Sequence, residues 1–380
     1  MSAFTLTQEQ ELFRTTVREL AEAKIGPRAA EIDETDEYPW DIHKILVENG
    51  LMAVGYPEEH GGIGGPMEFC VMIEEISRVS AGVSLIPLVN RLGSIPLFIA
   101  ASDEQKASVI PGIVDGSRQI AYCLTEPEAG SDAGSMRSKA TRDGDGWVIN
   151  GTKRFITNAG IADTYSYFAV TNPDAKKGRG ISLFIVYRDR EGFEVSKLEH
   201  KLGIKGSPTG EITMTDYQVK PGELVGNVDE GFTYAMKTLD FSRPTIAAQA
   251  LGIGQGAFDY AVGYAKEREQ FGQPISHFQG IQFMLADMAM QLEAARGLVY
   301  KSAQKVIDKA ADVSYHAAIA KCFASDAAMK VTTDAVQILG GYGYVKEYPV
   351  ERMMRDAKIT QIYEGTNQIQ RVVIGRTITR

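Results

Sequence analysis

Apolar and polar residues follow the period of an α-helix over residues 1–117. The first helix is predicted after Thr7-Gln8-Glu9-Gln10, which has the form of a capping box, in which the Thr and Gln side chains bind backbone groups at the helix start. Apolar residues at helical spacing follow it: Leu12, Phe13, Val17 and Leu20. This part of the chain therefore predicts an N-terminal helical domain.

Glycine and proline predict the limits of the next helices. A helix from Trp40 to Asn49 is expected to stop at Gly50, because glycine readily adopts the left-handed conformation that ends a helix. The Gly-rich run 61–65 reads as a loop, and Pro66 is placed to open the following helix.

The segment Ser84–Ala100 is apolar and contains Pro87 and Pro96, which are expected to interrupt it. Ser102-Asp-Glu-Gln105 is a second capping box. The helix that it opens is expected to end at Gly116.

Near Gln119 the period changes from 3.6 to 2 residues, which is typical of β-strands. Six short segments rich in β-branched and aromatic residues are predicted strands: 119–125, 147–149, 152–157, 165–171, 181–187 and 211–219. Turn residues separate them at Asp143-Gly-Asp-Gly146 and at Asn150-Gly151, and the second of these predicts a hairpin. We therefore expect a mostly antiparallel β-barrel or sandwich.

From Glu230 the chain returns to long helical segments, at 231–266, 277–308 and 312–339. The second segment carries apolar residues on nearly all faces: Ile281, Met284, Leu285, Met288, Leu292, Ala295 and Val299. Such a helix is buried in a bundle or between subunits. The predicted fold is α+β: an N-terminal helical domain (1–117), a central β-domain (118–229) and a C-terminal helical bundle (230–380) that also forms an oligomer interface.

Composition and charge exclude several classes of protein. Hydrophobic residues make up 44% of the 380 residues and charged residues 23%, as in globular rather than disordered chains. The net charge of −9 argues against a nucleic-acid-binding protein. The three cysteines are isolated and the five histidines lack metal-ligand spacing, so we expect neither a disulfide framework nor a metal site.

Targeting and membrane segments are not expected either. The start, from Met1 to Gln8, lacks the basic and apolar regions of a signal peptide. No apolar run reaches the ~20 residues that a membrane helix needs. Isolated cysteines fit a reducing compartment. We therefore expect a soluble intracellular protein with no membrane span.

The segment Arg355–Gln370 carries the strongest chemical signal. Glu364 lies between Tyr363 and Gly365, after apolar residues and before a new helix. A carboxylate among apolar groups is poorly hydrated, so its pKa rises and it becomes a better proton acceptor. Gly365 lets a ligand approach the backbone, and Thr366 can cap the helix that follows. We interpret Glu364 as a general base; the alternative is an ordinary acid at a helix start.

Two strand ends carry candidate binding residues. The segment Tyr122–Gly134 enters a Gly-rich turn, where Thr125 and Ser131 could bind an anion or the edge of a heterocycle; the alternative is a plain polar turn. Phe155 and Thr157 are two residues apart in a strand and so face one side, where one ligand could meet both. The alternative is a strand end that packs on its own sheet.

Two helix ends are further candidates. Arg268 could bind a pyrophosphate through two N–H groups of its guanidinium, or cap its helix. Gln337-Ile-Leu-Gly340-Gly341 lets a phosphate or ribose approach the backbone, although glycine is also an ordinary helix stop. Gly252-Ile-Gly254-Gln-Gly256-Ala257 fits a nucleotide-binding fingerprint, but no strand precedes it, so we interpret it as a helix–helix contact.

Together these segments resemble the acyl-CoA dehydrogenase family over nearly the whole chain. Tyr122–Gly134 and Gln361–Gln370 look like the two family signatures, and 268–275 and 337–341 are similar to further family motifs in the expected order. The resemblance implies a helical domain, a β-domain and a C-terminal four-helix bundle. It also implies FAD between the β-domain and the bundle, with part of its adenosine half gripped by a neighbouring subunit of a homotetramer, a dimer of dimers.

By this resemblance Glu364 is the catalytic base. The residues that match FAD contacts are Tyr122, Leu124, Thr125, Gly130, Ser131, Phe155, Ile156, Thr157, Arg268, Phe271, Gln279, Gln337, Gly340, Gly341, Thr366 and Gln368. The residues that match substrate contacts are Ser131, Asp240, Arg243, Tyr363 and Gly365. Many members have Trp in place of Phe155, and some carry the base at the position of Ser242, which cannot act as one.

The implied reaction is the α,β-dehydrogenation of an acyl-CoA thioester to a trans-2-enoyl-CoA, a step of fatty acid β-oxidation. Glu364 takes the α-proton, hydride passes to flavin N5, and the electrons go to an electron-transferring flavoprotein. The alternatives are an acyl-CoA oxidase-type enzyme that uses O₂, or a non-catalytic CoA- or flavin-binding scaffold. The chain is short for such an oxidase and ends in Thr379-Arg380 rather than a peroxisomal signal. The expected location is the bacterial cytoplasm or, in a eukaryote, an organelle matrix.

The acyl group is the least defined part of the predicted substrate. The residues expected at the end of its pocket are Leu85, Leu88, Val89, Asn90 and Tyr363. Their bulk favours a short-to-medium or branched chain. Arg91 is a nearby cation that leaves a charged acyl group open.

Overall fold

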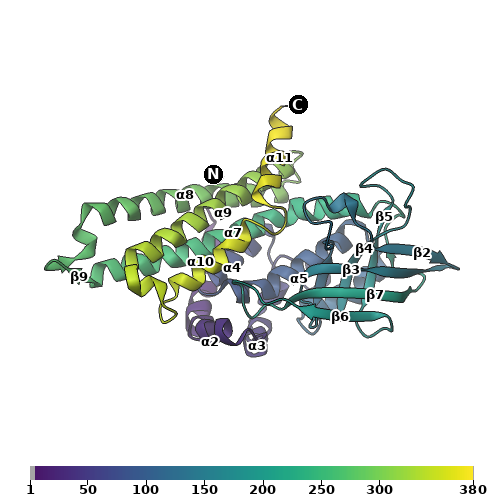
Figure 1. The fold of residues 1–380 in the computed structure, drawn as a ribbon, viewed down its shortest axis with the longest axis horizontal. Coiled ribbons are helices and arrows are strands. Elements are labelled where there is room, and N and C mark those ends of the chain that lie inside the picture. The colour runs from purple at the N-terminus through teal and green to yellow at the C-terminus, as the bar shows by residue number, and fades with distance from the viewer. Residues whose placement is uncertain (1–4, 380) are drawn as a thin grey trace.

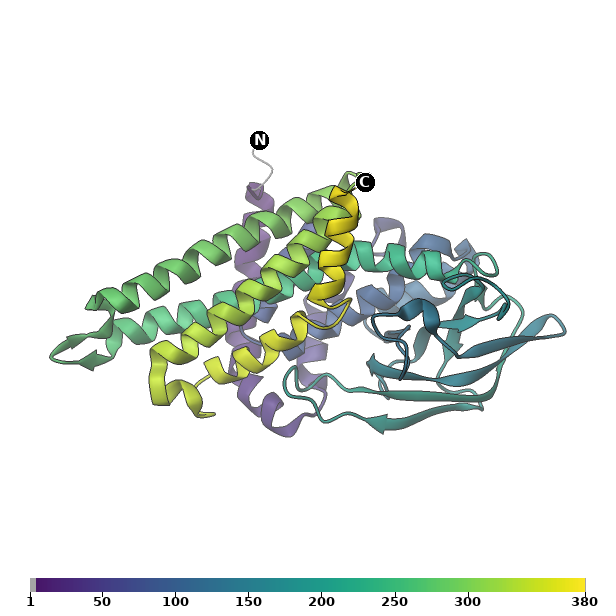
Figure 2. The same cartoon turned by 45° about the horizontal axis from the view of Figure 1, so that its top comes forward.

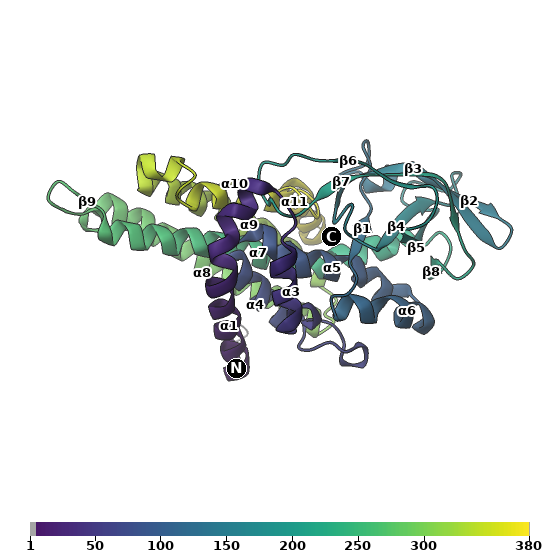
Figure 3. The same cartoon turned by 90° about the horizontal axis from the view of Figure 1, so that it is seen from below.

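The computed structural model describes residues 5–379 and has helical, β and helical parts in chain order, which confirms the α+β class. The long C-terminal helices and the sheet lie at opposite ends of the molecule (Figure 1). The first helices pack against one side of the C-terminal helices, as the view from below shows (Figure 3). Met1–Phe4 and Arg380, on which the signal-peptide and peroxisomal expectations partly rest, lie outside the described residues.

Several N-terminal helices begin or end at predicted residues. Their bounds are α1 Gln8–Leu20, α2 Ala29–Thr35, α3 Trp40–Glu48, α4 Pro66–Ser77, α5 Ala81–Ala100 and α6 Asp103–Val114. Both capping boxes are formed, at Thr7 and Ser102, and Pro66 opens α4 as expected. Gly50 and Gly116 have φ of +70° and +76°, the left-handed conformation that ends α3 and α6.

The central part is one open sheet, in the strand order β6-β7-β3-β2-β4-β5-β8 with β1 paired to β4. The strands are β1 Ile120–Cys123, β2 Lys139–Asp143, β3 Gly146–Thr157, β4 Thr164–Val170, β5 Ile181–Tyr187, β6 Phe193–Leu198, β7 Thr209–Val219 and β8 Leu224–Val225. Pairing is antiparallel except where β1 and β2 run parallel to β4. The edge strands β6 and β8 do not pair with each other, so the expectation of a closed barrel is wrong.

The hairpin predicted at Asn150-Gly151 is also wrong. β3 continues through these residues, and the tight turn lies at Asp143–Gly146, between β2 and β3. Asn150 instead reaches across to Asp216 on β7: its amide donates to Oδ1 at 3.0 Å, and its Oδ1 accepts the backbone N–H at 2.9 Å. These bonds stabilise a bulge in the β3–β7 pairing, a second setting that suits Asn-Gly.

The C-terminal part confirms the predicted long helices. They are α7 Gly231–Glu267, α8 Gln279–Ile307, α9 Val313–Leu339, α10 Val350–Thr360 and α11 Asn367–Ile378, and a small hairpin of β9 Glu269–Gln270 and β10 Gln273–Pro274 joins α7 to α8. α11 crosses α9 where the bundle approaches the sheet (Figure 2). A Cβ at Gly252 or Gly256 would lie 2.1 or 2.0 Å from a carbonyl oxygen of α4 or of its C-cap Arg78, so these glycines form the helix contact that was expected.

α5 contradicts the predicted interruption. It runs unbroken over 20 residues, although Pro87 and Pro96 lie inside it. It packs against α4, α7 and β1, and this burial outweighs a cost of roughly 3 kcal/mol for each internal proline. Contrary to expectation, α5 is also long and apolar enough to cross a membrane (mean hydropathy 1.6). Because 72% of this stretch is buried inside the protein, it has the character of a core helix.

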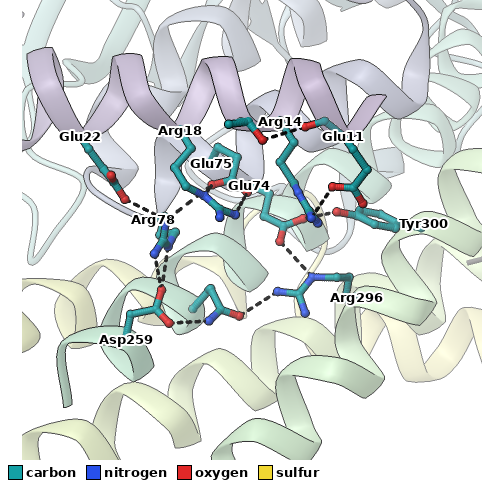
Figure 4. Close-up of polar contacts among 12 residues, drawn as sticks. Glu11, Arg14, Arg18, Glu22, Glu74, Glu75, Arg78, Asp259, Arg296 and Tyr300 are labelled. Carbon is teal, nitrogen blue, oxygen red and sulfur yellow. Dashed lines mark hydrogen bonds and ion pairs between the residues drawn. The ribbon is translucent and has the colours of Figure 1, made fainter. Parts of the chain in front are cut away.

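Buried ion pairs fasten the N-terminal helices to the bundle (Figure 4). On α4, Glu75 accepts two hydrogen bonds from Arg18 of α1, at 2.8 and 2.7 Å. The adjacent Glu74 accepts from the Tyr300 hydroxyl at 2.8 Å and from Arg296 at 3.2 Å, both on α8. Losing one partner of such a pair leaves a buried charge uncompensated, so the network fixes these helices relative to one another.

Candidate active site

A cavity of about 400 Å³ lies where α5, the sheet, the start of α7 and the loop before α11 meet. Many of the residues singled out from the sequence line it: Tyr122, Leu124, Thr125, Gly130, Ser131, Phe155, Ile156, Thr157, Arg243, Tyr363, Glu364 and Gly365. The fold therefore brings together the two strand-end motifs and the Glu364 segment, which are more than 200 residues apart in the chain.

Glu364 is a carboxylate in the wall of this cavity with a raised pKa. Its carboxylate accepts a hydrogen bond from the Ser242 hydroxyl, and the positive charges of Arg243 and Lys321 lie nearby. Burial raises the pKa of Glu364 to about 7, although the hydrogen bond and the two cations oppose the rise. A carboxylate with this pKa can accept a proton at neutral pH and bind it more firmly than an exposed one.

The loop that carries Glu364 has an unusual backbone. Glu364 and Gly365 have φ of +51° and +92°, and Thr366 caps α11 by accepting the backbone N–H of Ile369 at 3.3 Å. The Gln370 side chain donates to the carbonyls of both Glu364 and Gly365. Among residues 5–379, no acceptor is found for the backbone N–H of Glu364, which leaves this donor for a ligand.

Phe155 and Thr157 both line the cavity, but the strand alternation from which this was predicted does not hold here. Ile156 lines it as well, because a bulge between Lys153 and Ile156 breaks the alternation of β3 and Phe155 has φ +56°. The Phe155 ring is 59% exposed, far more than a core aromatic residue. An open aromatic face beside a hydroxyl suits a flat heterocycle.

The turn that holds Thr125 and Ser131 is fixed by a buried ion pair. Glu126 accepts from the Lys153 ammonium at 2.8 Å and from the backbone N–H groups of Arg137 and Ser138. Burial alone would raise the pKa of Glu126, but the attraction to Lys153 and these hydrogen bonds hold it below its usual value. The first end of the turn is thus fastened to β3 through Lys153, and its far end is fastened to Glu126.

Two loops meet across the mouth of the cavity. Lys177, from the loop between β4 and β5, pairs with Asp132 at 2.5 Å, and the Gly178 N–H donates to the Gly134 carbonyl at 3.3 Å. Lys177 and Gly178 line the cavity and were not singled out from the sequence. Their position between two predicted strands is the only signal that could have pointed to them.

Asp240 does not line the cavity. Its carboxylate accepts from Arg243 at 2.6 Å and from the Ser314 hydroxyl at 2.9 Å. Arg243 does line the cavity, and its buried Nε has no hydrogen-bond partner among the described residues. Asp240 therefore orients a guanidinium that still has a donor available.

Family models match three consecutive parts of the chain. They are the acyl-CoA dehydrogenase N-terminal domain (residues 7–117), middle domain (121–217) and C-terminal domain (229–379). The chain belongs to the acyl-CoA dehydrogenase family. It is therefore an oxidoreductase that acts on acyl-CoA, and the resemblance based on four motifs is confirmed.

Relatives match over nearly their full length. The probable acyl-CoA dehydrogenase FadE25 of Mycobacterium tuberculosis is 51% identical over 378 residues, which cover 99% of this chain and 97% of the relative. The structure of butyryl-CoA dehydrogenase from Megasphaera elsdenii is 42% identical with a TM-score of 0.96, covering 99% and 100% of the two chains. A chain from a structure described as the electron transferring flavoprotein of Acidaminococcus fermentans is 44% identical with a TM-score of 0.96, covering 99% of each.

A second group of family-motif residues lies at the opposite end of the bundle. Arg268, Gly340 and Gly341 line a depression together with Tyr342, and the Arg268 guanidinium stacks 5.3 Å above the Tyr342 ring. No carboxylate pairs with Arg268 among residues 5–379. The remaining motif residues at this end are exposed: Phe271 (94%), Gln279 and Gln337.

One chain does not bring these two groups together. Arg243 and Arg268 are separated by 25 residues of α7, or about 38 Å at 1.5 Å per residue. Figure 1 shows the β9 end of the bundle facing away from the sheet. Thr366 and Gln368, by contrast, lie beside Glu364 at the start of α11, and Gln368 is exposed.

The apolar wall of the cavity comes from α5. Leu85, Leu88 and Val89 line it as expected, together with Leu92, which was missed although it continues their helical spacing. Asn90 is not in the wall, because its side chain binds Gln119 and the Ile120 N–H. Further lining residues missed from the sequence are Phe232, Met236, Leu239 and Ile369. Arg91 does not line the cavity, because its guanidinium stacks on Tyr56 and Phe98.

Proposed function

We propose that this protein is an FAD-dependent dehydrogenase that introduces the α,β double bond into a short-chain acyl-CoA. The observation that carries the proposal is the position of Glu364, a base with a pKa of about 7 in the wall of a largely apolar cavity. Opposite kinds of surface meet there: an aromatic ring with a hydroxyl from β3, and the leucine-rich face of α5.

The residues present fit the cofactor. The open ring of Phe155 and the Thr157 hydroxyl offer a face and a hydrogen bond to a flat heterocycle, and the turn with Thr125 and Ser131 offers polar groups to its edge. When bound, FAD supplies the acceptor for the hydride that leaves the β-carbon. The other family residues that we propose as contacts are Tyr122, Leu124, Gly130, Ile156, Thr366 and Gln368.

The chain itself provides the proton chemistry. Glu364 takes the α-proton on its carboxylate, while Ser242 orients that carboxylate through a hydrogen bond. The backbone N–H of Glu364, which has no acceptor within residues 5–379, donates to the thioester oxygen, where negative charge develops. A preorganised donor of this kind is worth about 3–4 kcal/mol in the transition state. The apolar wall excludes water, which keeps the pKa of Glu364 high.

We propose that a second copy of the chain completes the cofactor site. Arg243 at the cavity and Arg268 are about 38 Å apart along α7 in one chain. In this proposal the residues at the far end serve the cofactor of a neighbouring copy: Arg268, Phe271, Gln279, Gln337, Gly340 and Gly341. Large apolar side chains are exposed on α8, α9 and α11, as expected of a surface that another copy covers: Phe283, Met290, Ile307, Phe323, Val372 and Ile378. The proposed assembly is a dimer of dimers.

The acyl group is proposed to be short, such as butyryl. Leu85, Leu88, Val89 and Leu92 narrow the cavity, and the likeness to a butyryl-CoA dehydrogenase supports this length. The likeness to a chain from an electron transferring flavoprotein structure supports such a flavoprotein as the electron acceptor.

The test is anaerobic mixing of the purified yellow protein with butyryl-CoA. Bleaching of the flavin and formation of crotonyl-CoA are expected. No bleaching by acyl-CoA of any length would contradict the proposal. An oxygen-uptake assay in air separates a dehydrogenase, which consumes little O₂, from an oxidase.

The rate of flavin reduction is expected to rise with pH and level off above about pH 8. Glu364 acts only as a carboxylate, and its pKa of about 7 places the half-maximal rate near neutrality rather than near pH 4.5. Single-turnover rates measured between about pH 5.5 and 9 check this. A rate that is constant down to pH 5.5 would mean that no group of this pKa limits the reaction.

Arg268→Ala is expected to weaken FAD binding roughly 10- to 100-fold, because a hydrogen bond to a charged group contributes about 1.5–3 kcal/mol. The ratio of flavin to protein after gel filtration measures the effect. Arg142→Ala is the matched control, since Arg142 also stacks on an aromatic ring, 5.0 Å above Trp147, but lies at the β2–β3 turn. An equal flavin-to-protein ratio in both variants would show that Arg268 does not bind FAD.

A further inference from the structure

A buried lysine lies against the loop that carries Glu364. Lys321 comes from the middle of α9 and is 0% exposed. Its ammonium donates to the Gly365 carbonyl at 2.8 Å and to Asn367 Oδ1 at 3.0 Å. Four of its neighbours on α9 are small apolar residues, so packing against them does not call for a charged side chain here: Ala317, Ala318, Ala320 and Ala324.

Asn367, the second partner of Lys321, is itself held in place. Its amide donates to the Ser325 hydroxyl at 2.8 Å and to Asp326 Oδ1 at 2.7 Å, both on α9. The network therefore joins α9 to the first residue of α11, with the Glu364–Gly365 turn between them. Both residues of that turn have positive φ, a conformation that costs a non-glycine residue about 1–3 kcal/mol and persists only when its surroundings hold it.

The charges around these groups come from several elements. Glu364 faces Arg243 and Ser242 of α7 and Lys321 of α9. Its negative charge also helps to raise the pKa of the Tyr122 hydroxyl on β1. Lys321 faces Glu364, Arg243, Asp326 and the Cys322 thiol. Burying an ammonium group away from water costs free energy unless the group is paired and hydrogen-bonded. A lysine at this position is therefore expected to serve the protein in a way that offsets this cost.

We propose that Lys321 is a positioning residue for proton abstraction by Glu364. Its ammonium holds the Gly365 carbonyl, and through it the left-handed turn that aims the carboxylate into the cavity. Its charge also favours the ionised form of that carboxylate, the form that accepts a proton. The inference rests on the proposed function, in which Glu364 is the base.

Lys321→Met tests the role of the charge, because Met has a similar length and no charge. Without the cation, the rising limb of the pH–rate profile for flavin reduction by butyryl-CoA is expected to shift to higher pH by about one unit. The variant is then about tenfold slower than wild type near pH 6, since one pH unit is a factor of ten in the fraction of ionised carboxylate. This deficit narrows above about pH 8, where Glu364 is ionised in both proteins.

Two more variants separate charge from structure. Lys321→Gln keeps an N–H donor without a charge and is expected to shift the limb in the same way, which tests the inference even if Lys321→Met does not fold. Lys330→Met is the matched control: Lys330 also lies on α9 but pairs with Asp334 at the surface, and its profile is expected to match wild type. A deficit in the Lys321 variants that is the same at every pH would overturn the role of the charge, and no deficit at any pH would overturn the proposal.

A second measurement does not depend on catalysis. Amide hydrogen exchange in the peptide covering residues 361–370 is expected to be at least about threefold faster in Lys321→Met than in wild type, and unchanged in Lys330→Met. Equal exchange would contradict the positioning role. A mixed outcome is also informative: no acyl-CoA bleaches the flavin of the wild-type protein, but exchange is still faster in Lys321→Met. That result would support the role of Lys321 in the loop and refute only the proposed function.

Discussion

Glu364→Gln is expected to lower the rate of flavin reduction by butyryl-CoA by more than about a thousandfold while FAD stays bound. Gln has nearly the same shape as Glu and can keep the hydrogen bond to Ser242, but it cannot accept a proton. Loss of a general base reduces rates by about 10²–10⁴. Rapid mixing under anaerobic conditions measures the rate, and the ratio of flavin to protein shows that the cofactor is retained.

Glu347→Gln provides the control for this experiment. Glu347 is exposed and lies shortly before α10, so its substitution removes one carboxylate without touching the cavity. Its rate is expected to equal that of wild type. If Glu364→Gln reduced flavin at a near-normal rate, Glu364 would not be the base, and the mechanism proposed above would have to be given up.

Lys153→Met is expected to lower the free energy of unfolding by about 3–5 kcal/mol, the usual cost of removing one partner of a buried ion pair. Lys153 is 0% exposed and binds both Glu126 and the Leu124 carbonyl, so its loss leaves the Glu126 carboxylate buried without a cation. Denaturant unfolding of the FAD-loaded protein measures the change.

The double variant Lys153→Met/Glu126→Gln is expected to recover at least half of that loss. A neutral amide at position 126 carries no charge to compensate, and its oxygen still accepts one of the backbone N–H groups that Glu126 binds. A single variant as stable as wild type, or a double variant no more stable than the single one, would show that the ion pair does not hold the turn.

Local chemistry made much of the fold predictable. The capping boxes at Thr7 and Ser102 and the proline at position 66 act on backbone groups within three residues, so they mark helix limits whatever packs around them. The Glu364 segment was identified from its local sequence as well, because the carboxylate lies between Tyr363 and Gly365 and before the Thr366 cap. The domain limits at 117/118 and 229/230 remain predictions.

The errors occurred where distant contacts decide the structure. Pro87 and Pro96 were expected to break α5, but burial against neighbouring helices and strands, α4, α7 and β1 among them, keeps the helix intact. Asn150-Gly151 was predicted to form a hairpin turn, but Asn150 instead binds Asp216 of β7 and the strand continues through it. The strands β2 and β6 were missed because most of their side chains are exposed or only partly buried, so they lack the apolar alternation of a buried strand.

Lys321 shows the same limit within the active site. A lysine among alanines in an apolar helix was visible in the sequence, but the carbonyl that it binds lies 44 residues later. Only the folded chain shows that the two meet.

The left-handed backbone at Glu364 has a consequence for how mutations accumulate in this protein. A glycine there would relieve the conformational penalty, so selection for stability alone would favour replacing the carboxylate. The side chain is therefore expected to persist in lineages that need the reaction and to drift toward glycine in copies that have lost it. Stability and turnover pull this one position in opposite directions.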